Sequence, residues 1–362
     1  MTTVGIPTET KQDERRVALT PGGAAELTAR GIDVVVQSGA GLGSAIADEE
    51  YAVVGARIVE HAEQAWACDI VCKVKEPQSG EFGYLRDDLT LFTFLHLAAY
   101  PGVARALLDA GTTAIAYETV EVDGTLPLLA PMSEIAGRLS IQAGASHLEA
   151  PHGGRGVMLG GVPGVAPANV AVIGGGHVGW NAARIAAGMG ATVTILDINV
   201  ARLRTLDDLL FGRMTTRASN RADVEEAIAT ADLVIGAVLV PGAKAPHVVT
   251  EDHIRTMRPG SVVVDVAIDQ GGCVATSRET SHREPTYVVH DVVHYAVGNM
   301  PGAVPRTSTF ALTNVTLPYL VALAAHGVDG AIDVRPELAG GLNTRAGAIT
   351  HPAVEVALHA VA

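Results

Sequence analysis

Three glycines at fixed spacing are the most specific chemical signal in the chain. Gly174, Gly176 and Gly179 match G-x-G-x-x-G after the strand-like start of 169–176 and at the opening of a helical stretch. In this motif the first glycine permits a tight turn, the second lets the backbone approach a pyrophosphate, and the third allows the helix to pack closely on the strand. The N–H groups and the dipole of a helix N-terminus favour an anion. The pattern predicts a dinucleotide site.

An acid follows these glycines at a distance suited to the ribose. Asp197 ends the next strand-like run, 23 residues after Gly174, where a carboxylate can accept hydrogen bonds from ribose hydroxyls. Because an acid there would repel a 2′-phosphate, it favours NAD over NADP, although the nearby Arg202 weakens this preference. A glycine-rich turn alone is a weak signal, but strand, glycines, helix, strand and acid occur here in register.

Four further side chains lie near the ends of strand-like runs, where open α/β sheets bind ligands. They are Arg16, Lys75, His96 and Asp269. Each also has a purely structural interpretation. Arg16 and Lys75 fit solvated surface charges, His96 fits a hydrogen-bonded core histidine, and Asp269 precedes two glycines that fit an ordinary turn. Position alone does not assign these residues a role.

Other kinds of site find no support in the sequence. Cys68 and Cys72 have no second ligand pair, so we expect them to pack rather than to bind zinc. His290 and His294 in HDVVH imitate part of a zinc-protease motif. However, Asp rather than Glu follows the first histidine, and 285–293 predicts a strand, where i and i+4 form no helical ligand pair. GxSxG and a P-loop lysine are absent, which argues against hydrolases and kinases.

The elements that position these residues alternate between strands and helices. Early in the chain we predict helices at 21–31 and 101–111 and strands at 32–41, 69–74 and 112–120, a pattern typical of βαβ units and a parallel sheet. Two long helices, 130–150 and 307–328, the second with a proline kink, bracket a second alternating region. Its strand-like runs are 169–176, 191–197, 232–238, 261–267 and 285–293. We therefore expect an inserted domain that two long helices join to the first.

The composition agrees with a two-domain α/β protein. The 362 residues exceed what one core usually serves, only 4% are aromatic, and glycine is abundant at 40 residues. The net charge of −14 argues against nucleic acid or an anionic membrane as a partner, but allows a local cationic site. Three cysteines are too few for a disulfide framework. No signal peptide and no long uninterrupted apolar run is evident, so we expect a soluble cytoplasmic protein.

Several sequence blocks together resemble the alanine dehydrogenases, a family related to the NAD-binding part of proton-translocating transhydrogenase. The blocks extend from near residue 4 to near residue 345 and include VGIPTETKQDERRVALTP, KVKEP, FTFLHLAA, GGRGVMLGGVPGV and VDVAIDQGG. The resemblance implies two Rossmann-like, doubly wound α/β domains with parallel sheets, linked by two long helices, with the active site in the interdomain cleft. The substrate domain would comprise 1–129 and 306–362, and the inserted NAD-binding domain 130–305.

The resemblance also assigns roles to the ambiguous residues. Arg16 and Lys75 match the residues that bind the substrate carboxylate, Met132 matches a residue near the substrate, and His96 and Asp269 match the catalytic pair. The implied cofactor-binding positions are Ser133, Gly174, Gly176, His177, Val178, Gly179, Asp197, Arg202, Ser219, Val238, Leu239, Val266, Ala267, Ile268, Asp269, Arg278, Val297, Gly298, Asn299 and Met300.

The implied reaction is the NAD-dependent oxidative deamination of L-alanine to pyruvate and ammonia, and its reverse. An arginine fork and a lysine charge suit a carboxylate. His96 and Asp269 would transfer the protons that the iminium and carbinolamine stages need, and hinge closure would bring the two domains' residues together. Some family members hold magnesium through a Glu and a His four residues apart. Here His326 is present, but the residue four positions before it is Ala322. Because alanine supplies no oxygen ligand, we expect no metal at this position. Hexamers are common in the family, so the resemblance implies a homo-oligomer, specifically a hexamer.

Three other functions stay open at this point. A saccharopine-type dehydrogenase would act on a larger amino acid, and a transhydrogenase-like subunit would pass hydride to a nucleotide on a partner. A redox-sensing protein would bind NAD without turnover. The presence of Arg16, Lys75, His96 and Asp269 argues against the transhydrogenase-like alternative, which needs no clamp for a substrate carboxylate.

Overall fold

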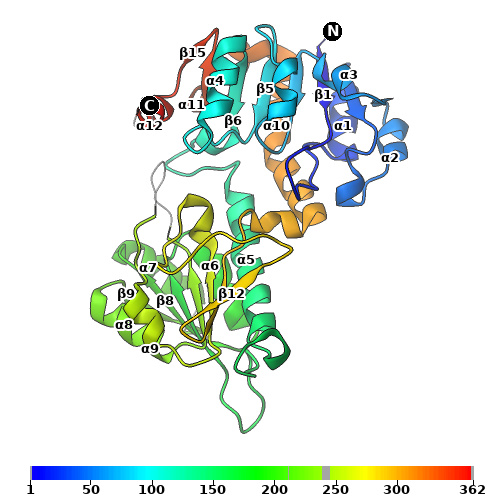
Figure 1. The fold of residues 1–362 in the computed structure, drawn as a ribbon. Coiled ribbons are helices and arrows are strands. Elements are labelled where there is room, and N and C mark those ends of the chain that lie inside the picture. The colour runs from blue at the N-terminus through cyan, green and yellow to red at the C-terminus, as the bar shows by residue number, and fades with distance from the viewer. Residues whose placement is uncertain (1, 211, 239–244, 360–362) are drawn as a thin grey trace. The chain divides into compact units, whose positions relative to one another are not determined.

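The structure, a computed structural model, describes residues 2–210, 212–238 and 245–359 (Figure 1). The chain forms two compact units. Unit 1 comprises Met1–Met132 and Val304–Ala362, and unit 2 comprises Ser133–Ala303. Unit 2 is thus inserted in sequence between the two parts of unit 1.

Unit 1 contains an eight-stranded sheet in the order β15-β14-β6-β5-β4-β1-β2-β3. Its first six strands in sequence are parallel, and the winding direction reverses between β1 and β4. Open α/β sheets bind ligands at the carboxyl ends of strands beside such a switch point. The strands are β1 (Thr3–Ile6), β2 (Asp33–Gln37), β3 (Arg57–Val59), β4 (Ile70–Cys72), β5 (Thr90–Thr93), β6 (Thr113–Ala116), β14 (Leu342–Arg345) and β15 (Ala348–Ile349).

Local sequence explains where several helices of unit 1 begin and end. The Thr20 hydroxyl accepts the Gly23 N–H and Pro21 opens α1, while Gly111, at φ 70°, ends α4. The helices are α1 (Pro21–Thr28), α2 (Asp48–Val53), α3 (Ala62–Trp66), α4 (Pro101–Ala110), α10 (Pro305–Val334), α11 (Leu338–Gly341) and α12 (Pro352–His359), with short 3₁₀ turns η1 (Leu42–Ser44), η2 (Ser79–Tyr84) and η3 (Tyr117–Thr119).

The long helix α10 differs from its prediction in one respect. The predicted helix 307–328 continues to Val334 past one residue with non-helical dihedrals, Gly327, at φ 67° and ψ −178°, and Pro318 lies inside the helix. Only glycine adopts such dihedrals without steric cost. By length and composition α10 could cross a membrane, a test that core helices of soluble proteins also pass. Leu312, Leu320 and Leu323 of α10 are buried.

Unit 2 repeats the winding of unit 1 in a seven-stranded sheet ordered β12-β13-β11-β10-β7-β8-β9. All of its neighbouring strands are parallel except β12 and β13, and the switch point lies between β7 and β10. The strands are β7 (Asn169–Ile173), β8 (Thr192–Asp197), β9 (Thr215–Ala218), β10 (Leu233–Gly236), β11 (Val262–Asp265), β12 (Thr286–Val289) and β13 (Val292–Tyr295).

The single strand expected at 285–293 is wrong. The run folds back on itself as the antiparallel pair β12 and β13, with His290 and Asp291 at φ 52° and 60° in the two-residue turn. Positive φ at both central residues is the geometry that a tight hairpin requires. The valine pairs on either side of His290 and Asp291 belong to different strands, and these two polar residues form the reversal.

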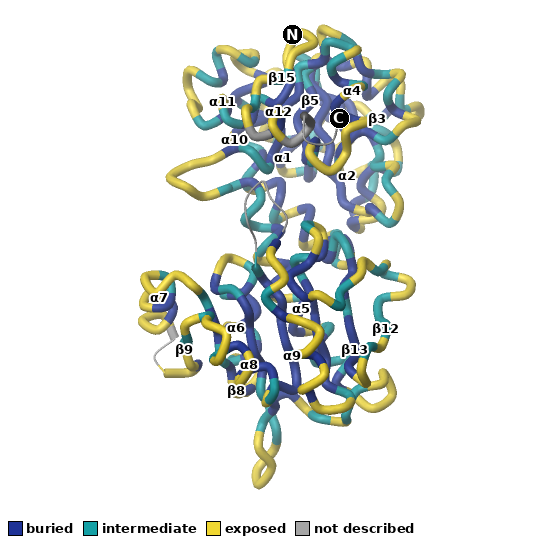
Figure 2. Tube along the Cα trace, turned by 60° about the vertical axis from the view of Figure 1, so that its left-hand side comes forward, coloured by how far each residue is buried: buried dark blue, intermediate teal, exposed yellow. Residues whose placement is uncertain are grey.

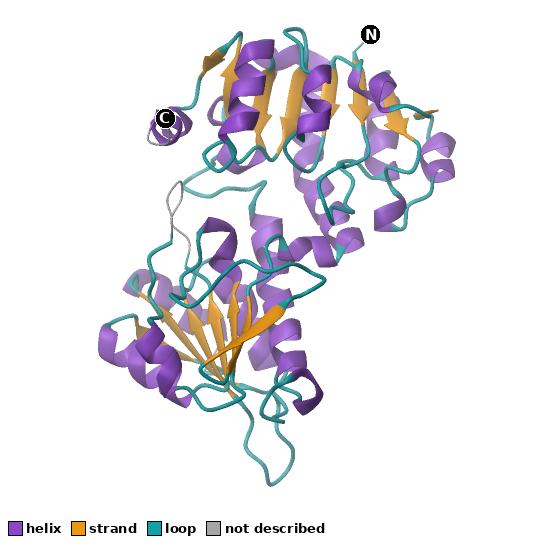
Figure 3. Cartoon of the chain, viewed as in Figure 1, coloured by secondary structure: helices purple, strands orange, loops and turns teal. Residues whose placement is uncertain are grey.

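Helices cover both faces of each sheet (Figure 3). In β7, Val170 and Val172 contribute to one hydrophobic cluster and Ala171 and Ile173 to another. This double burial is why the strands read as continuous apolar runs, and it confirms the predicted doubly wound α/β class, with antiparallel strands added at the sheet edges. The helices are α5 (Ala130–His147), α6 (His177–Gly188), α7 (Val200–Leu210), α8 (Arg221–Thr230) and α9 (Glu251–Thr256), with η4 (Ala150–His152), η5 (Val266–Gln270) and η6 (Met300–Ala303).

Candidate substrate and dinucleotide sites

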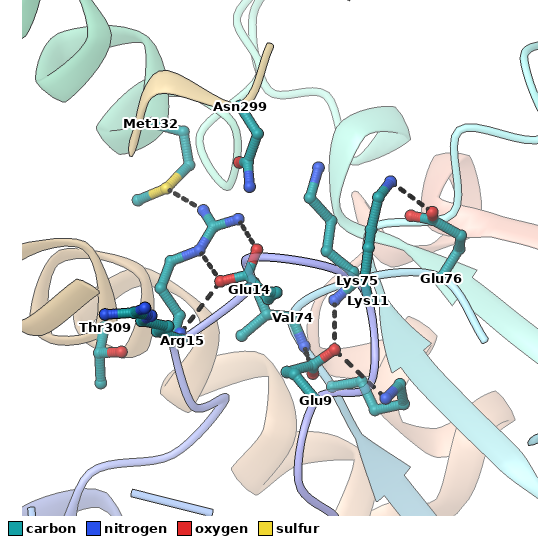
Figure 4. Close-up of polar contacts among 12 residues, drawn as sticks. Glu9, Lys11, Glu14, Arg15, Val74, Lys75, Glu76, Met132, Asn299 and Thr309 are labelled. Carbon is teal, nitrogen blue, oxygen red and sulfur yellow. Dashed lines mark hydrogen bonds and ion pairs between the residues drawn. The ribbon is translucent and has the colours of Figure 1, made fainter. Parts of the chain in front are cut away.

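Arg16 lies in the segment that follows β1 and is 2% exposed. Its Nε and Nη2 donate to the two carboxylate oxygens of Glu14 at 2.7 and 2.5 Å, and its Nη1 contacts the Met132 sulfur at 3.1 Å (Figure 4). Burial raises the pKa of Glu14, but the charge and hydrogen bonds of Arg16 outweigh it and lower that pKa to about 2. A planar, bidentate pair of this kind fixes the orientation of the guanidinium. Arg16 and Met132, both predicted to lie near the substrate, are therefore in contact.

The segment that carries Arg16 is fixed by the start of α10. Thr309 Oγ1 accepts the Val17 N–H at 3.0 Å and lies 2.8 Å from the Ser44 hydroxyl. Arg306 donates to the Ala45 carbonyl at 2.8 Å. Thr309 thus fixes the backbone at Val17, next to Arg16, while the ion pair with Glu14 offsets the burial of the Arg16 charge.

Lys75 follows β4, the neighbour of β1 at the switch point, and its backbone is anchored by a buried ion cluster. Glu9 accepts the Val74 N–H at 2.6 Å and the Lys75 N–H at 3.4 Å. The fully buried Lys73 ammonium lies 3.2 Å from Glu9 and 2.9 Å from Glu81. Burial lowers the pKa of Lys73, but the two carboxylates outweigh it and raise that pKa. The cluster holds the chain in a fixed path at Lys75.

His96 follows β5 and faces positive charge. Burial lowers the pKa of its imidazole well below the ordinary value, and Lys75, Lys11 and Arg16 lower it further. The same Lys75 charge also lowers the pKa of Glu14. The three predicted residues Arg16, Lys75 and His96 therefore lie in one electrostatic neighbourhood, with the histidine neutral and able to accept a proton.

Lys11 was missed in the sequence analysis. Its ammonium donates to Glu76 at 2.6 Å and to the Tyr100 hydroxyl at 3.2 Å, and it lies 4.7 Å from the centre of the Tyr100 ring. Figure 4 draws Lys11 beside Lys75, with Glu76 next to it. Glu9 and Glu14 were missed as well, since neither residue type nor spacing distinguishes them from solvated acids.

In unit 2, the predicted glycines form the turn between β7 and α6, and at two of them a larger residue would clash. A Cβ on Gly174 would lie 2.6 Å from the Ala237 oxygen, and one on Gly179 would lie 1.8 Å from the Gly174 oxygen. A Cβ on Gly176 would meet nothing within 4 Å, and Gly176 caps α6 without a side-chain hydrogen bond. The first and third glycines are needed by the protein itself, whereas the second faces open space at a helix N-terminus. This arrangement fits a pyrophosphate.

The acid expected near the ribose is tied to the same turn. Asp197 Oδ2 accepts the Gly175 N–H at 2.6 Å, and its Oδ1 accepts the Asn199 N–H at 2.7 Å. Arg202 Nε donates to the Gly175 carbonyl at 2.7 Å, and the Ser219 N–H donates to the Asp197 carbonyl at 3.0 Å. Asp197 and Arg202 therefore meet at Gly175, and Ser219 is held beside Asp197.

Other predicted cofactor positions lie around this turn. His177 and Val178 open α6, and Ser133 lies on α5, which approaches α6 closely enough that a Cβ on Gly137 would be 2.2 Å from the Val178 oxygen. Val238 follows β10, the strand across the switch point. Leu239 lies outside the described residues.

Asp269 is exposed on η5, directly after β11. Its Oδ1 accepts the Asn299 N–H at 3.0 Å, and Asn299 has the rare φ of 57°. A Cβ on Gly298 would lie 2.2 Å from Glu279 Oε1 and 3.2 Å from Asp269 Oδ1. The Asn299 N–H thus links the Asp269 loop to the block that contains Asn299, and a side chain at 298 would displace the Glu279 carboxylate. The remaining predicted positions nearby are Val266, Ala267 and Ile268 on η5, Arg278, whose guanidinium carbon lies 4.1 Å from the Tyr287 ring centre, and the buried Val297 and Met300.

The histidines and cysteines considered above as metal ligands do not lie together in a metal-binding arrangement. His290 contacts Glu251 at 2.8 Å, whereas His294 is buried on β13 and lies 2.8 Å from the Thr276 hydroxyl. Cys68, Cys72 and Cys273 are buried free thiols. His326 is exposed on α10, while Ala322 is buried. Within the described ranges, no three His, Cys, Asp or Glu side chains are grouped to hold a metal ion.

Comparison with known proteins gives consistent matches along the whole chain. Two family models match: "Alanine dehydrogenase/PNT, N-terminal domain" at residues 5–136 and "Alanine dehydrogenase/PNT, C-terminal domain" at residues 140–352. The chain is 59% identical over 348 residues to an alanine dehydrogenase of Mycobacterium tuberculosis, which covers 96% of this chain and 94% of the relative. It is 55% identical over 352 residues to one of Bacillus subtilis, which covers 97% and 93% respectively.

Solved structures agree with the sequence comparison. A structure described as L-alanine dehydrogenase superposes with a TM-score of 0.96 at 51% identity and covers all of both chains. A transhydrogenase from Sinorhizobium meliloti superposes with a TM-score of 0.83 at 27% identity and covers 97% of this chain and 99% of its own. The predicted resemblance is thus confirmed, and the chain belongs to the alanine dehydrogenase/PNT family.

Proposed function

We propose that this chain catalyses the NAD-dependent oxidative deamination of L-alanine to pyruvate and ammonia, and the reverse reductive amination. The observation that carries the proposal is the buried Arg16 fork, oriented by Glu14 and Met132 beside the Lys75 charge. A small 2-oxo or 2-amino acid offers the carboxylate that such a pair binds. The names of the relatives support the same substrate.

NAD is the cofactor that the glycine turn of unit 2 fits. Gly174 and Gly179 shape the turn, and the N-terminus of α6 at Gly176 would hold the pyrophosphate. Asp197 would bind the ribose hydroxyls. When bound, the oxidised cofactor would accept the hydride in deamination and the reduced cofactor would donate it in the reverse reaction. We assign Ser133, His177, Val178, Arg202, Ser219, Val238, Leu239 and Arg278 to the same site, with Val266, Ala267, Ile268 and the block from Val297 to Met300.

His96 and Asp269 are the proposed proton-transfer residues. Because the pKa of His96 is lowered, its imidazole is neutral at ordinary pH and can accept a proton from the substrate amine or from water. Asp269 is exposed on η5, and the Asn299 N–H orients its carboxylate, which would stabilise positive charge at the substrate nitrogen. The chain thus provides a carboxylate clamp, a neutral imidazole that can accept a proton, and a carboxylate that can stabilise positive charge.

The decisive experiment follows NADH absorbance with pyruvate, ammonium and NADH, in parallel with glyoxylate and larger 2-oxo acids. We expect pyruvate to give the highest kcat/KM, and NADH to form from NAD with L-alanine alone. A preference for a larger 2-oxo acid would support a saccharopine-type enzyme. NADH binding without turnover on any of these acids would contradict the proposal.

Two variants test the proposed roles. We expect His96→Ala and Asp269→Asn to reduce turnover by about 100-fold or more, in the range of general acid–base effects. NADH affinity, measured by fluorescence titration, should stay close to that of the wild-type protein. Wild-type turnover in either variant would remove that residue from the catalytic pair.

We further propose that the protein is a soluble, cytoplasmic homo-oligomer, a hexamer as the family resemblance implies, with no nucleic-acid or membrane partner. The net charge of −14 supports the exclusion of polyanionic partners. Ala322 supplies no oxygen ligand beside His326, so we propose that no divalent ion binds there.

A further inference from the structure

His96 has an unusual backbone conformation. Its φ is 48°, in the left-handed region that residues other than glycine seldom adopt. A single side chain persists in this region only where its surroundings determine it, and such residues concentrate at functional sites. The surroundings of the His96 backbone therefore indicate what sets the direction of its imidazole.

The Glu118 carboxylate provides those surroundings. It accepts the His96 N–H at 2.5 Å and the Leu95 N–H at 3.1 and 3.3 Å to its two oxygens. Two successive N–H groups that point at one anion are the arrangement that a turn into the left-handed region creates. The Glu118 side chain is only 14% exposed, so water competes little for these charge-assisted hydrogen bonds.

The fold places these residues together because β5 and β6 are parallel neighbours. Thr93 pairs with Ala116 in the sheet. His96 comes three residues after Thr93, and Glu118 comes two residues after Ala116. Both therefore leave the sheet at the same edge, the carboxyl edge that also carries Arg16 and Lys75.

The imidazole itself has few other constraints. Its ring stacks on Phe94, with centroids 5.6 Å apart and planes 2° apart, and its Nδ1 lies 3.7 Å from Glu118 Oε1. The stacking fixes the plane of the ring, whereas the backbone dihedrals fix the direction in which the side chain leaves the backbone. Glu118 acts on the backbone dihedrals.

We propose that Glu118 is a positioning residue for the reaction: its carboxylate holds the His96 backbone in the left-handed conformation and thereby aims the imidazole at the substrate. This inference rests on the proposed function of His96. Glu118 itself need not touch the substrate, so its contribution should appear in kcat and depend on His96.

The test is a double-mutant cycle of Glu118→Gln and His96→Ala in the full-length protein, with pyruvate, ammonium and NADH. Glutamine keeps the size of the side chain but loses the charge and presents an amide N–H₂ where a carboxylate oxygen accepted. A catalytic group displaced by about an ångström loses roughly 100-fold in rate, so we expect Glu118→Gln to reduce kcat by roughly 10- to 100-fold. The KM for pyruvate and the Kd for NADH should change by less than about threefold.

The cycle separates positioning from a structural role. In the His96→Ala background, Glu118→Gln should change kcat by less than about twofold, because the residue that it positions is gone. Equal losses of kcat in both backgrounds would overturn the proposal. Glu121→Gln, the same substitution at an exposed glutamate nearby, is the matched control and should leave all constants unchanged.

The remaining outcomes are also decisive. If His96→Ala retains wild-type turnover, the proposed role of His96 fails. If His96→Ala loses turnover while Glu118→Gln retains the wild-type kcat, only the inference about Glu118 fails. Should Glu118→Gln not fold, Glu118→Asp replaces it. The shorter carboxylate cannot reach both N–H groups, and the same dependence on His96 is expected.

Discussion

At the scale of single residues, buried glutamates determine how the proposed clamp is built. Glu14 orients the Arg16 guanidinium, and Glu9 anchors the backbone at Lys75. Neither acid was recognisable from the sequence, because ETKQDERR has the composition of a solvated loop. Arg16 and Lys75 were equally ambiguous by position. Only the blocks shared with a known family pointed to them, since a role that depends on partners distant in sequence leaves no local pattern.

The Glu14–Arg16 pair makes a testable contribution to stability. The pKa of Glu14 is lowered from 4.5 to about 2, so the pair stabilises the fold fully above about pH 4.5, and this contribution is lost as the pH falls toward 2. The difference in unfolding free energy between the wild type and Glu14→Gln should shrink by about 1.4 kcal/mol per pH unit below 4.5. Urea unfolding from pH 6 to 3.5 measures it. A difference that stays constant across this range would contradict the assigned pKa.

Asp197 is the residue on which the preference for NAD depends. Asp197→Ala removes the proposed ribose acceptor and the bond to the Gly175 N–H. Loss of a charged hydrogen bond corresponds to roughly 10- to 100-fold in affinity. We expect the Kd for NADH to rise by that factor and the discrimination against NADPH to weaken. Fluorescence titration with both nucleotides measures this, with Asp208→Ala, at an exposed acid on α7, as the control. An unchanged Kd for NADH would show that the ribose lies elsewhere.

At the scale of elements, the sequence was most informative where a strand is buried on both faces. The parallel strands were predicted because their apolar runs continue through both sheet faces, as Val170 to Ile173 illustrate. Prediction failed at the ends and turns. The reversal at His290 and Asp291 and the helix break at Gly327 depend on one or two residues with positive φ.

Helix α6 allows the roles of its glycines to be separated. In Gly179→Ala the new Cβ would lie 1.8 Å from the Gly174 oxygen, so α6 must move away from β7. We expect a loss of about 2–3 kcal/mol in stability, typical of overpacking, together with loss of NADH binding. In Gly176→Ala nothing lies within 4 Å of the new Cβ. This variant should therefore keep its thermal midpoint but bind NADH at least 10-fold more weakly, because the methyl group occupies the space of the pyrophosphate.

Gly188→Ala is the matched control for both variants. It lies on the same helix, and a Cβ there also meets nothing within 4 Å. Since alanine favours helix over glycine by up to about 1 kcal/mol, the control should be at least as stable as the wild type and bind NADH normally. Equal NADH affinity in Gly176→Ala and Gly188→Ala would contradict the placement of the pyrophosphate at the start of α6.

At the scale of the whole molecule, net charge and local charge have opposite signs. The chain carries −14 overall, yet Arg16, Lys75 and Lys11 act together on His96. Composition alone therefore predicted which polyanions are excluded, but not the sign of the site. The cationic group needs no excess of basic residues, because buried acids hold its members in place: Glu14 pairs with Arg16, Glu76 pairs with Lys11, and Glu9 anchors the backbone at Lys75.

The proposed oligomer has a candidate contact in unit 2. A short hairpin, closed by the bridge between Val162 and Val165, leaves these two side chains 52% and 63% exposed, and Met158 beside it is also exposed (Figure 2). Apolar side chains presented together on a projecting hairpin are typical of a contact surface. Light scattering should give a mass of about 224 kDa, six times the 37.3 kDa of one chain.

The hairpin's part in assembly is tested by the double variant Val162→Asp and Val165→Asp. Charges placed in an apolar contact oppose association, so the mass should fall to that of smaller assemblies. Val53→Asp introduces the same change at an exposed valine of α2 in unit 1 and serves as the control. A wild-type mass near 37 kDa would contradict the oligomer. A full-size assembly in the double variant would instead assign the contact to another surface, since a repulsion of this kind cannot be accommodated where apolar side chains meet.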